Sequence, residues 1–217
     1  MRFKSAIFDL DGTVADSGEG IVKSVSYALE KMGIFDYDES ENYRFIGPPL
    51  IESFIRFFSM TREEARCAVE YFRERYNVSG VYECKVYPRV RELLFELKKR
   101  GVKLYIGSSK PEKYIRQILE NEKLADLFEY ISGATLDGSI ETKEQVLTQL
   151  FENATLDKST AVMIGDRYHD IEGAHAVGLP CIAVLYGFGG KEEFLAHGAD
   201  YIVAGAEEIL KIIVSEE

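Results

Sequence analysis

The segment Asp9-Leu10-Asp11-Gly12-Thr13 comes at the end of a short apolar run that begins at Ser5. A short apolar run that ends in acidic residues is typical of a buried parallel strand whose carboxyl end carries polar side chains. Further runs of this kind follow along the chain, at residues 102–107, 130–133, 160–165, 181–184 and 201–203. The sequence therefore predicts a β-sheet assembled from segments spread over most of the chain.

Helical patterns separate the later apolar runs. Apolar residues recur at helical spacing in residues 90–97, 114–119, 146–151 and 171–177, and Thr142 with Gln145 forms a capping box before the third of these. Strand and helix alternate from about residue 86 onward. Such alternation is typical of an α/β fold, and we expect a Rossmann-like parallel sheet flanked by helices.

Residues 17–80 interrupt this alternation. They show helical spacing of apolar residues and a capping box at Thr61 and Glu64, without a convincing strand. We therefore expect an α/β core of residues 1–16 and 81–217 and a small inserted helical domain of residues 17–80. An insertion directly after the first strand would place this domain at the carboxyl edge of the sheet, where α/β proteins bind ligands.

The amino-acid composition limits the kinds of molecule that this chain is expected to bind. The formal net charge of −11 disfavours nucleic-acid polymers and anionic membranes, because both bind through lysine and arginine. No apolar run approaches the roughly 18 residues of a membrane span, and three widely spaced cysteines suggest reduced thiols. We expect a cytoplasmic protein, a monomer or a homodimer, that acts on a small molecule. An anionic substrate would need a local cation.

Asp9 and Asp11 form the first candidate catalytic pair. Side chains at positions i and i+2 of an extended segment point to the same side, so both carboxylates can face one substrate. Asp9 could attack phosphorus as a nucleophile, while Asp11 could protonate the leaving oxygen and later deprotonate water. Gly12 permits a sharp turn, and Thr13 could offer its hydroxyl or amide to a phosphate oxygen. The alternative is a solvated turn, since Asp and Gly are favoured turn residues, but the position of these five residues directly after an apolar run argues against it.

Three further residues follow other predicted strands. Ser108 and Ser109 come after the second strand, before a helix, where a hydroxyl and backbone amides could bind phosphate oxygens. Lys143 lies at the start of the next helix, where the helix dipole disfavours a cation, so we expect it to have another role. That role would be to neutralise the attacking carboxylate and the phosphoryl group. Each feature alone is also typical of a helix cap or a surface lysine.

Asp166 and Asp170 follow the fourth strand of the core. Carboxylate oxygens at the carboxyl end of a buried strand are suitable ligands for Mg²⁺, and they would lie beside Asp9. Magnesium is therefore the expected cofactor. It would supply positive charge that this acidic chain lacks. In isolation, the two aspartates could also be a helix cap and a surface residue.

Four segments, in order and each at the end of a strand, resemble the motifs of the haloacid dehalogenase superfamily. These are Asp9-Leu10-Asp11-Gly12-Thr13, Ser108, Lys143 and Gly165-Asp166-Arg167-Tyr168-His169-Asp170. The resemblance implies that Asp9 and Asp166 bind Mg²⁺ through their side chains and Asp11 through its carbonyl, with Asp170 supporting them. Thr13 resembles the phosphatases of the superfamily. The dehalogenases themselves lack the second aspartate of the pair, which argues against dehalogenation.

The inserted helical domain resembles the small α-helical cap of the phosphoglycolate-phosphatase-like branch. There, the segment around Ile46, Gly47 and Pro48 resembles a loop that faces the active site, which implies a role in substrate choice. The implied activity is Mg²⁺-dependent hydrolysis of a small phosphomonoester, such as phosphoglycolate or a nucleoside 5′-monophosphate, through an aspartyl-phosphate. A phosphomutase and a pyrophosphatase remain alternatives. A phosphorelay receiver is more remote, because a receiver has no cap.

Overall fold

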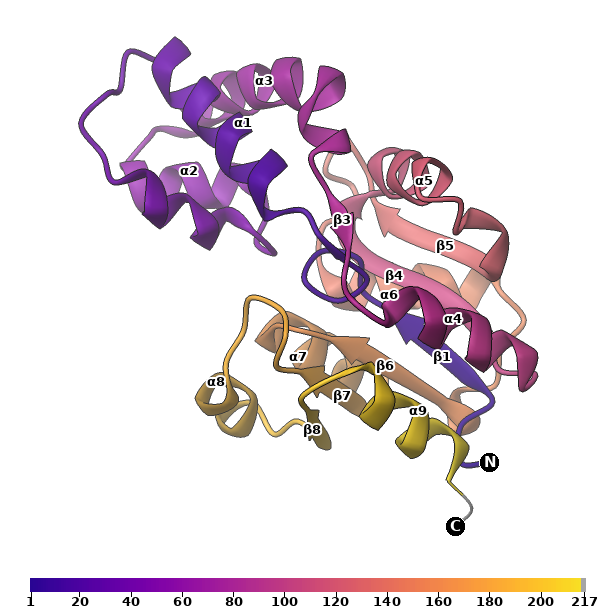
Figure 1. Cartoon of the computed structure of the whole chain (residues 1–217). Helices are drawn as coiled ribbons and strands as arrows, with labels where there is room; N and C mark the ends of the chain where they lie inside the picture. Colours follow the sequence, from indigo (N-terminus) through magenta and orange to yellow (C-terminus); the bar gives the residue numbers. More distant parts are fainter. Residues whose placement is uncertain (216–217) are drawn as a thin grey trace. The chain divides into compact units, whose positions relative to one another are not determined.

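The computed structural model describes residues 1–215, and its central feature is a parallel sheet of six strands (Figure 1). Its strand order is β5-β4-β1-β6-β7-β8. The strands are β1 (Ser5–Phe8), β4 (Lys103–Pro111), β5 (Phe128–Ala134), β6 (Ala161–Gly165), β7 (Cys181–Val184) and β8 (Tyr201–Val203). Each pair of neighbouring strands is parallel. The predicted Rossmann-like α/β fold is confirmed.

Helices cover both faces of the sheet. They are α4 (Val90–Lys99), α5 (Glu112–Asn121), α6 (Lys143–Asn153), α7 (Tyr168–Ala176), α8 (Lys191–Ala196) and α9 (Ala206–Val214). Figure 1 shows α4 and α9 over one face and α6 and α7 over the other. All four residues of β1 are buried, as expected for a strand with both faces covered. Ile7 of β1, for example, packs in a cluster with Leu147 of α6 and Ile171 of α7.

The strand order places the carboxyl ends of three strands around one point. Strand β1 lies in the interior of the sheet, with β4 and then β5 on one side of it and β6, β7 and β8 on the other. Open α/β sheets bind ligands beyond the carboxyl ends of their strands at such a reversal. The residues that follow β1 and β6 and those at the end of β4 therefore lie at the position where a ligand is expected.

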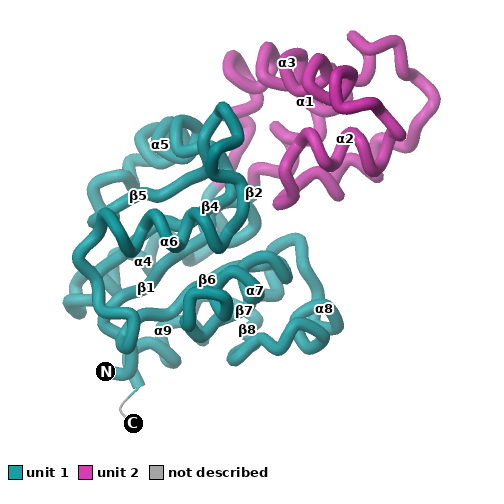
Figure 2. Tube along the Cα trace, turned by 180° about the vertical axis from the view of Figure 1, so that it is seen from behind, with its two compact units in different colours: residues 1–16, 86–217 teal, residues 17–85 magenta. Residues whose placement is uncertain are grey.

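The chain divides into two compact units, residues 1–16 with 86–217 and residues 17–85 (Figure 2). The second unit contains α1 (Gly18–Lys31), α2 (Leu50–Phe58), α3 (Arg62–Val78) and the 3-10 helices η1 (Glu39–Phe45) and η2 (Gly80–Tyr82). The predicted capping box of Thr61 and Glu64 begins α3. Inside this unit, the ring of Phe45 contacts that of Phe54 at a centroid distance of 4.8 Å. The unit extends to Lys85, five residues beyond the boundary drawn from the sequence.

Several elements differ from the sequence expectations. Strand β4 continues to Pro111, whereas the apolar run predicted its end at Gly107. Helices α8 and α9 and the short paired strands β2 (Ala15–Asp16) and β3 (Lys85–Val86) were not predicted. The capping box of Thr142 and Gln145 is present at the start of α6, as predicted. Among the described residues, no helix is both long and apolar enough to span a bilayer.

Candidate active site

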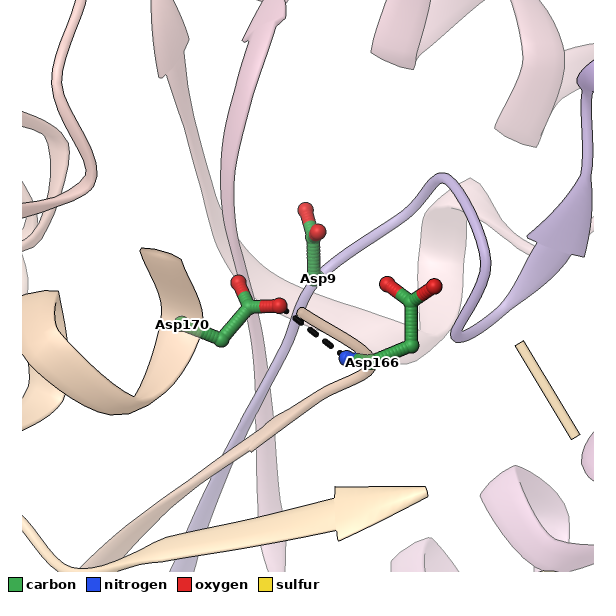
Figure 3. Close-up of side chains that lie close together, drawn as sticks. All are labelled: Asp9, Asp166 and Asp170. Atoms are coloured by element: carbon green, nitrogen blue, oxygen red, sulfur yellow. Dashed lines mark hydrogen bonds between the residues drawn. The ribbon is translucent and has the colours of Figure 1, made fainter. Parts of the chain in front are cut away.

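Three aspartates converge at the carboxyl ends of β1 and β6. Asp9 follows β1, Asp166 follows β6, and Asp170 lies in the first turn of α7. One carboxylate oxygen from each lies within 4.8 Å of the others (Figure 3). The parallel pairing of β1 with β6 causes this convergence, because the Asp9 N–H donates to the Ile164 carbonyl at 2.9 Å. The structure therefore brings together residues separated by more than 150 positions in the sequence.

Backbone hydrogen bonds fix the carboxylate of Asp170. Its Oδ2 accepts the N–H groups of Asp166 and Arg167, both at 3.0 Å, and its Oδ1 lies 2.8 Å from Nζ of Lys143. Gly165 permits this approach, since a Cβ there would lie 2.2 Å from the Asp170 Cγ. Through these contacts Asp170 orients the backbone after β6 and the ammonium group of Lys143.

Lys143 is the buried cation beside Asp9. As the first residue of α6 it is only 5% exposed, and its Nζ lies 2.9 Å from Asp9 Oδ1. The same Nζ donates to the Gly107 carbonyl at 2.9 Å and lies 2.8 Å from Asp170 Oδ1, so three oxygen atoms surround the ammonium group. Burial alone would lower the pKa of Lys143, but the charges of Asp170 and Asp9 outweigh it and raise the pKa. Lys143 is therefore a permanent positive charge.

Asp166 presents an unsatisfied carboxylate oxygen. Its Oδ2 accepts the Phe188 N–H at 2.7 Å, while its buried Oδ1 has no hydrogen-bond partner among the described residues. Burial, and then the charges of Asp170 and Asp9, raise the pKa of Asp166 well above its usual value. Gly187 allows the loop with Phe188 to pass this close, because a Cβ there would lie 2.4 Å from the Asp166 Cβ. A buried carboxylate with such an oxygen is stable as an anion only when a positive charge lies beside it.

The pKa of Asp9 is also raised. Burial is the main cause, Lys143 opposes it, Asp170 adds to it, and a hydrogen bond from the Ser108 hydroxyl opposes it. Ser108 is 2% exposed near the end of β4, and β4 is paired with β1. The structure thus places Ser108 beside Asp9, as the sequence predicted. Its neighbour Ser109 alternates with it along the strand and is half-buried.

Asp11 is paired with a residue that sequence reasoning did not assign. Lys110 Nζ lies 3.0 Å from Oδ1 and 2.9 Å from Oδ2 of Asp11, and the Lys110 side chain is 5% exposed. Lys110 lies two residues after Ser108 on β4, where the pairing with β5 shifts register between Ser108 and Pro111. The sequence prediction missed Lys110 because it ended this strand at Gly107.

The turn after Asp11 holds Thr13 and Gly12 in place. Thr13 is fully buried, and its Oγ1 has no hydrogen-bond partner among residues 1–215. Its carbonyl accepts the Tyr186 hydroxyl at 3.0 Å. Gly12 has a φ of +78°, and a Cβ there would lie 2.0 Å from Asp166 Oδ2. Glycine is therefore required both for the backbone conformation and for the space.

The predicted specificity residues lie in the other unit. Ile46, Gly47 and Pro48 follow η1 and precede α2. Ile46 is 1% exposed, Gly47 is exposed with a φ of +104°, and Pro48 is half-buried. Contact of these residues with a substrate remains a prediction. The burial of Ile46 leaves little of its side chain for such a contact.

The model of the haloacid dehalogenase-like hydrolase family matches residues 6–184. The chain belongs to this family. A 5′-nucleotidase from Pseudomonas aeruginosa is 38% identical to this hydrolase over 215 residues, which cover 99% of this chain and 97% of the relative. A protein named tyrosine-protein kinase PtkA from Mycobacterium tuberculosis is 34% identical over 94% of this chain and 69% of its own length.

Solved structures agree with this assignment. A protein described as a predicted phosphatase from Clostridium acetobutylicum superposes on this hydrolase with a TM-score of 0.94 and 42% identity, over 99% of each chain. The expected family membership, drawn from four short segments, is confirmed, and so is the expectation that the chain is an enzyme.

The residues of this hydrolase fit a bound Mg²⁺. Mg²⁺ prefers oxygen ligands, and Asp166, whose Oδ1 has no partner in residues 1–215, lies in the same cluster as the Asp9 carboxylate. The four carboxylates of the site face two ammonium groups, so two negative charges remain uncompensated when all are ionised. One divalent cation would balance them.

Proposed function

We propose that this chain is a Mg²⁺-dependent phosphatase that hydrolyses a small phosphomonoester, with Asp9 as the nucleophile. The observation that carries the proposal is the environment of the Asp9 carboxylate. Lys143 binds one of its oxygens at 2.9 Å, and Asp166 lies beside it with a buried oxygen that has no partner among the described residues. This arrangement holds a carboxylate between a fixed cation and a site for a second cation, as attack on an anionic phosphate ester requires.

The reaction would proceed in two displacements at phosphorus. In the first, an Asp9 oxygen forms a bond to phosphorus as the ester P–O bond breaks, and Asp11 donates a proton to the leaving oxygen. In the second, Asp11 takes a proton from water, the water oxygen attacks phosphorus, and the Asp9–phosphorus bond breaks. Inorganic phosphate leaves, and the free carboxylate of Asp9 is restored. The two steps balance in atoms and charge as the hydrolysis of one ester.

The other polar residues would stabilise the transferring group. The hydroxyl of Thr13, which has no partner in the described part of the chain, and that of Ser108 could donate to phosphoryl oxygens. Ser109 could contribute its backbone N–H. Lys143 would offset the charge that Asp9 and the phosphoryl oxygens share. Asp170 would hold Lys143 in position, since its Oδ1 lies 2.8 Å from Nζ.

Asp9 and Asp166 would hold Mg²⁺ through their carboxylates, and Asp11 through its main-chain carbonyl. When bound, Mg²⁺ would offset the negative charge of the phosphate ester and of the surrounding carboxylates. Asp170 is a weaker candidate ligand, because its Oδ2 already accepts two backbone N–H groups. We therefore assign Asp170 a supporting role, although its Oδ1 lies within the same cluster.

The helical unit would act as a cap domain. A cap excludes bulk water and limits the size of the substrate. Ile46, Gly47 and Pro48 are our candidates for residues that select the substrate. The substrate class would be small phosphorylated metabolites, with phosphoglycolate and nucleoside 5′-monophosphates as the first to test. The similarity to a 5′-nucleotidase supports including the nucleotides. We expect no nucleic-acid polymer or membrane partner, and a cytoplasmic monomer or homodimer.

The test is an assay of the purified chain with p-nitrophenyl phosphate, with and without Mg²⁺. We expect hydrolysis only with Mg²⁺ and a loss of at least about 10³-fold in Asp9→Asn, since that change removes the nucleophile. Asp126→Asn, at an exposed aspartate of the same unit, is the matched control and should retain full activity. Undiminished activity in Asp9→Asn would contradict the proposal.

A substrate panel then separates the alternatives. It contains phosphoglycolate, nucleoside 5′-monophosphates, sugar phosphates and pyrophosphate, and the measured products are inorganic phosphate and any phosphorylated acceptor. Release of phosphate from a monoester supports the proposed function. A preference for pyrophosphate would indicate a pyrophosphatase. Transfer to a sugar without release of phosphate would indicate a phosphomutase.

A further inference from the structure

Lys110 and Asp11 form a second buried ion pair in the site, separate from that of Lys143 and Asp9. Asp11 follows β1, and Lys110 lies near the end of β4, which pairs with β1. The ammonium contacts both carboxylate oxygens, at 3.0 and 2.9 Å, and the side chains are 5% and 13% exposed. Contact with both oxygens fixes the rotation of the carboxylate as well as its position.

Stability alone is a weak explanation for this pair. Removing an ammonium and a carboxylate from water costs several kcal/mol per ion, and their mutual attraction often only repays that cost. A buried pair that adds little to folding is more readily explained by the geometry it imposes. Here the fixed group is Asp11, to which the proposed function assigns both proton transfers.

We propose that Lys110 is a positioning residue that holds the Asp11 carboxyl group in the orientation from which, in its protonated form, it donates its proton to the leaving oxygen and becomes the carboxylate. This inference rests on the proposed function, because it presupposes that Asp11 protonates a leaving group. The structure shows Lys110 bound to Asp11, while Lys143 binds Asp9 and Asp170. The two lysines therefore contact different carboxylates. Removal of Lys110 should affect a different part of the reaction from removal of Lys143.

The dependence on the leaving group distinguishes positioning from a merely structural role. A p-nitrophenolate departs without a proton, whereas a phenolate with an electron-donating substituent departs far more readily when protonated. Loss of Lys110 should therefore slow the reaction most for the poor leaving groups. A general loss of folding, binding or Mg²⁺ would slow all substrates by one common factor.

The experiment measures kcat/KM of the full chain with Mg²⁺ on p-nitrophenyl, phenyl and p-methoxyphenyl phosphates, which differ little in shape. For Lys110→Met we expect a loss below about fivefold on the p-nitrophenyl ester and of about 10²-fold on the p-methoxyphenyl ester. Asp11→Asn should show the same trend. The double variant should lose less than about twofold beyond Asp11→Asn alone, because both changes remove one function.

Two further variants complete the design. Lys110→Arg keeps the cation and should recover most of the loss on the p-methoxyphenyl ester, and it also provides a folded variant if Lys110→Met does not fold. Lys103→Met changes an exposed lysine at the opposite end of β4 and should match the wild type on all three esters. Circular dichroism confirms that each variant is folded.

The possible failures are distinguishable. Equal losses across the three esters, or losses that multiply in the double variant, would overturn the role of Lys110 and leave the phosphatase intact. No improvement in Lys110→Arg, with an equal loss on all three esters, would do the same. A wild-type chain that hydrolyses none of the esters would overturn the proposed function, and this inference with it.

Discussion

The ammonium group of Lys143 lies 2.9 Å from Oδ1 of Asp9, although the two residues are separated by 134 positions in the sequence. The side chains are 3% and 13% exposed, so water screens their attraction only weakly. Lys143 also lies 2.8 Å from Asp170, so this one cation compensates two carboxylates. Burial raises the pKa of Asp9, and the charge of Lys143 partly opposes this effect.

Replacement of Lys143 should impair both activity and stability. We expect Lys143→Met to lose about 10²- to 10³-fold in kcat, as the loss of one charge-stabilising group commonly does. The free energy of unfolding should fall by about 3–5 kcal/mol, because two buried carboxylates lose their partner. Activity assays and urea unfolding measure the two effects. Lys103→Met is the control. A Lys143→Met variant with the same kcat and the same free energy of unfolding as this control would contradict the proposed role of Lys143.

Gly12→Ala tests the tight packing of the turn against Asp166. A Cβ at Gly12 would lie 2.0 Å from Asp166 Oδ2, and φ is +78°. Gly178 has nearly the same φ, +79°, but no neighbouring atom of residues 1–215 lies within 4 Å of its Cβ position. Gly178→Ala therefore carries only the backbone cost of about 1 kcal/mol. We expect Gly12→Ala to lose activity at least tenfold more than Gly178→Ala, consistent with a displaced Asp166. Equal activity in the two variants would show that Asp166 can move without consequence.

Removal of the Asp166 charge should stabilise the metal-free protein. Because burial raises the pKa of Asp166, its folded state holds a proton more tightly than its unfolded state, and stability falls as pH rises from about 4 through the raised folded pKa. At neutral pH, Asp166→Asn removes this penalty. We expect the metal-free variant to melt a few degrees above the wild type, at about 2–4 °C for each kcal/mol.

Mg²⁺ should reverse the order of the two melting temperatures, so that the wild type melts above Asp166→Asn. It should raise the melting temperature of the wild type, since a ligand that binds only the folded state stabilises it, and it should leave Asp166→Asn nearly unchanged. Thermal scans in EDTA and in Mg²⁺ measure both effects, with Asp126→Asn as the matched control. An equal Mg²⁺ shift in the wild type and in Asp166→Asn would place the metal elsewhere.

The three cysteines should differ sharply in reactivity. Cys67 is exposed, Cys84 is partly buried and Cys181 is buried in β7. Burial raises the pKa of the Cys181 thiol well above its usual value, and the charges of Asp170 and Asp200 add to this effect. Thiolate is the reactive form, so we expect iodoacetamide at mildly alkaline pH to modify Cys67 fastest and Cys181 only after denaturation. Peptide mass spectrometry measures the order in which the three cysteines are modified. Early modification of Cys181 would contradict its burial.

Much of the α/β core could be predicted from the sequence because buried parallel strands leave a strong pattern. Each apolar run corresponds to a strand, within a few residues at either end. The convergence of Asp9 and Asp166 also followed, because parallel strands end at one edge of a sheet. The position of Lys143 against the helix dipole was only a weak signal, and the family resemblance assigned this lysine to the site; the structure shows the two carboxylates that surround it.

The residues that were missed have physical explanations. Ser108 and Ser109 resemble the end of a strand, but β4 pairs with β5 again at Pro111 and Ala134 after a register shift, so Lys110 still lies within β4. Tertiary pairing here overrides local preference. Phe188 acts through its backbone N–H, which its side chain does not reveal. The substrate could not be predicted, because no sequence pattern specifies which residues of the helical unit would contact it.

The central claim is that Asp9 carries the phosphoryl group, and the most direct test is to trap it there. The chain is mixed with p-nitrophenyl phosphate and Mg²⁺, quenched in acid during turnover, digested and analysed by mass spectrometry. We predict a hydroxylamine-sensitive adduct with the mass of one phosphoryl group on the peptide that contains Asp9, and none in Asp9→Asn. Rapid turnover without any adduct, or an adduct on another residue such as Ser108, would contradict the account.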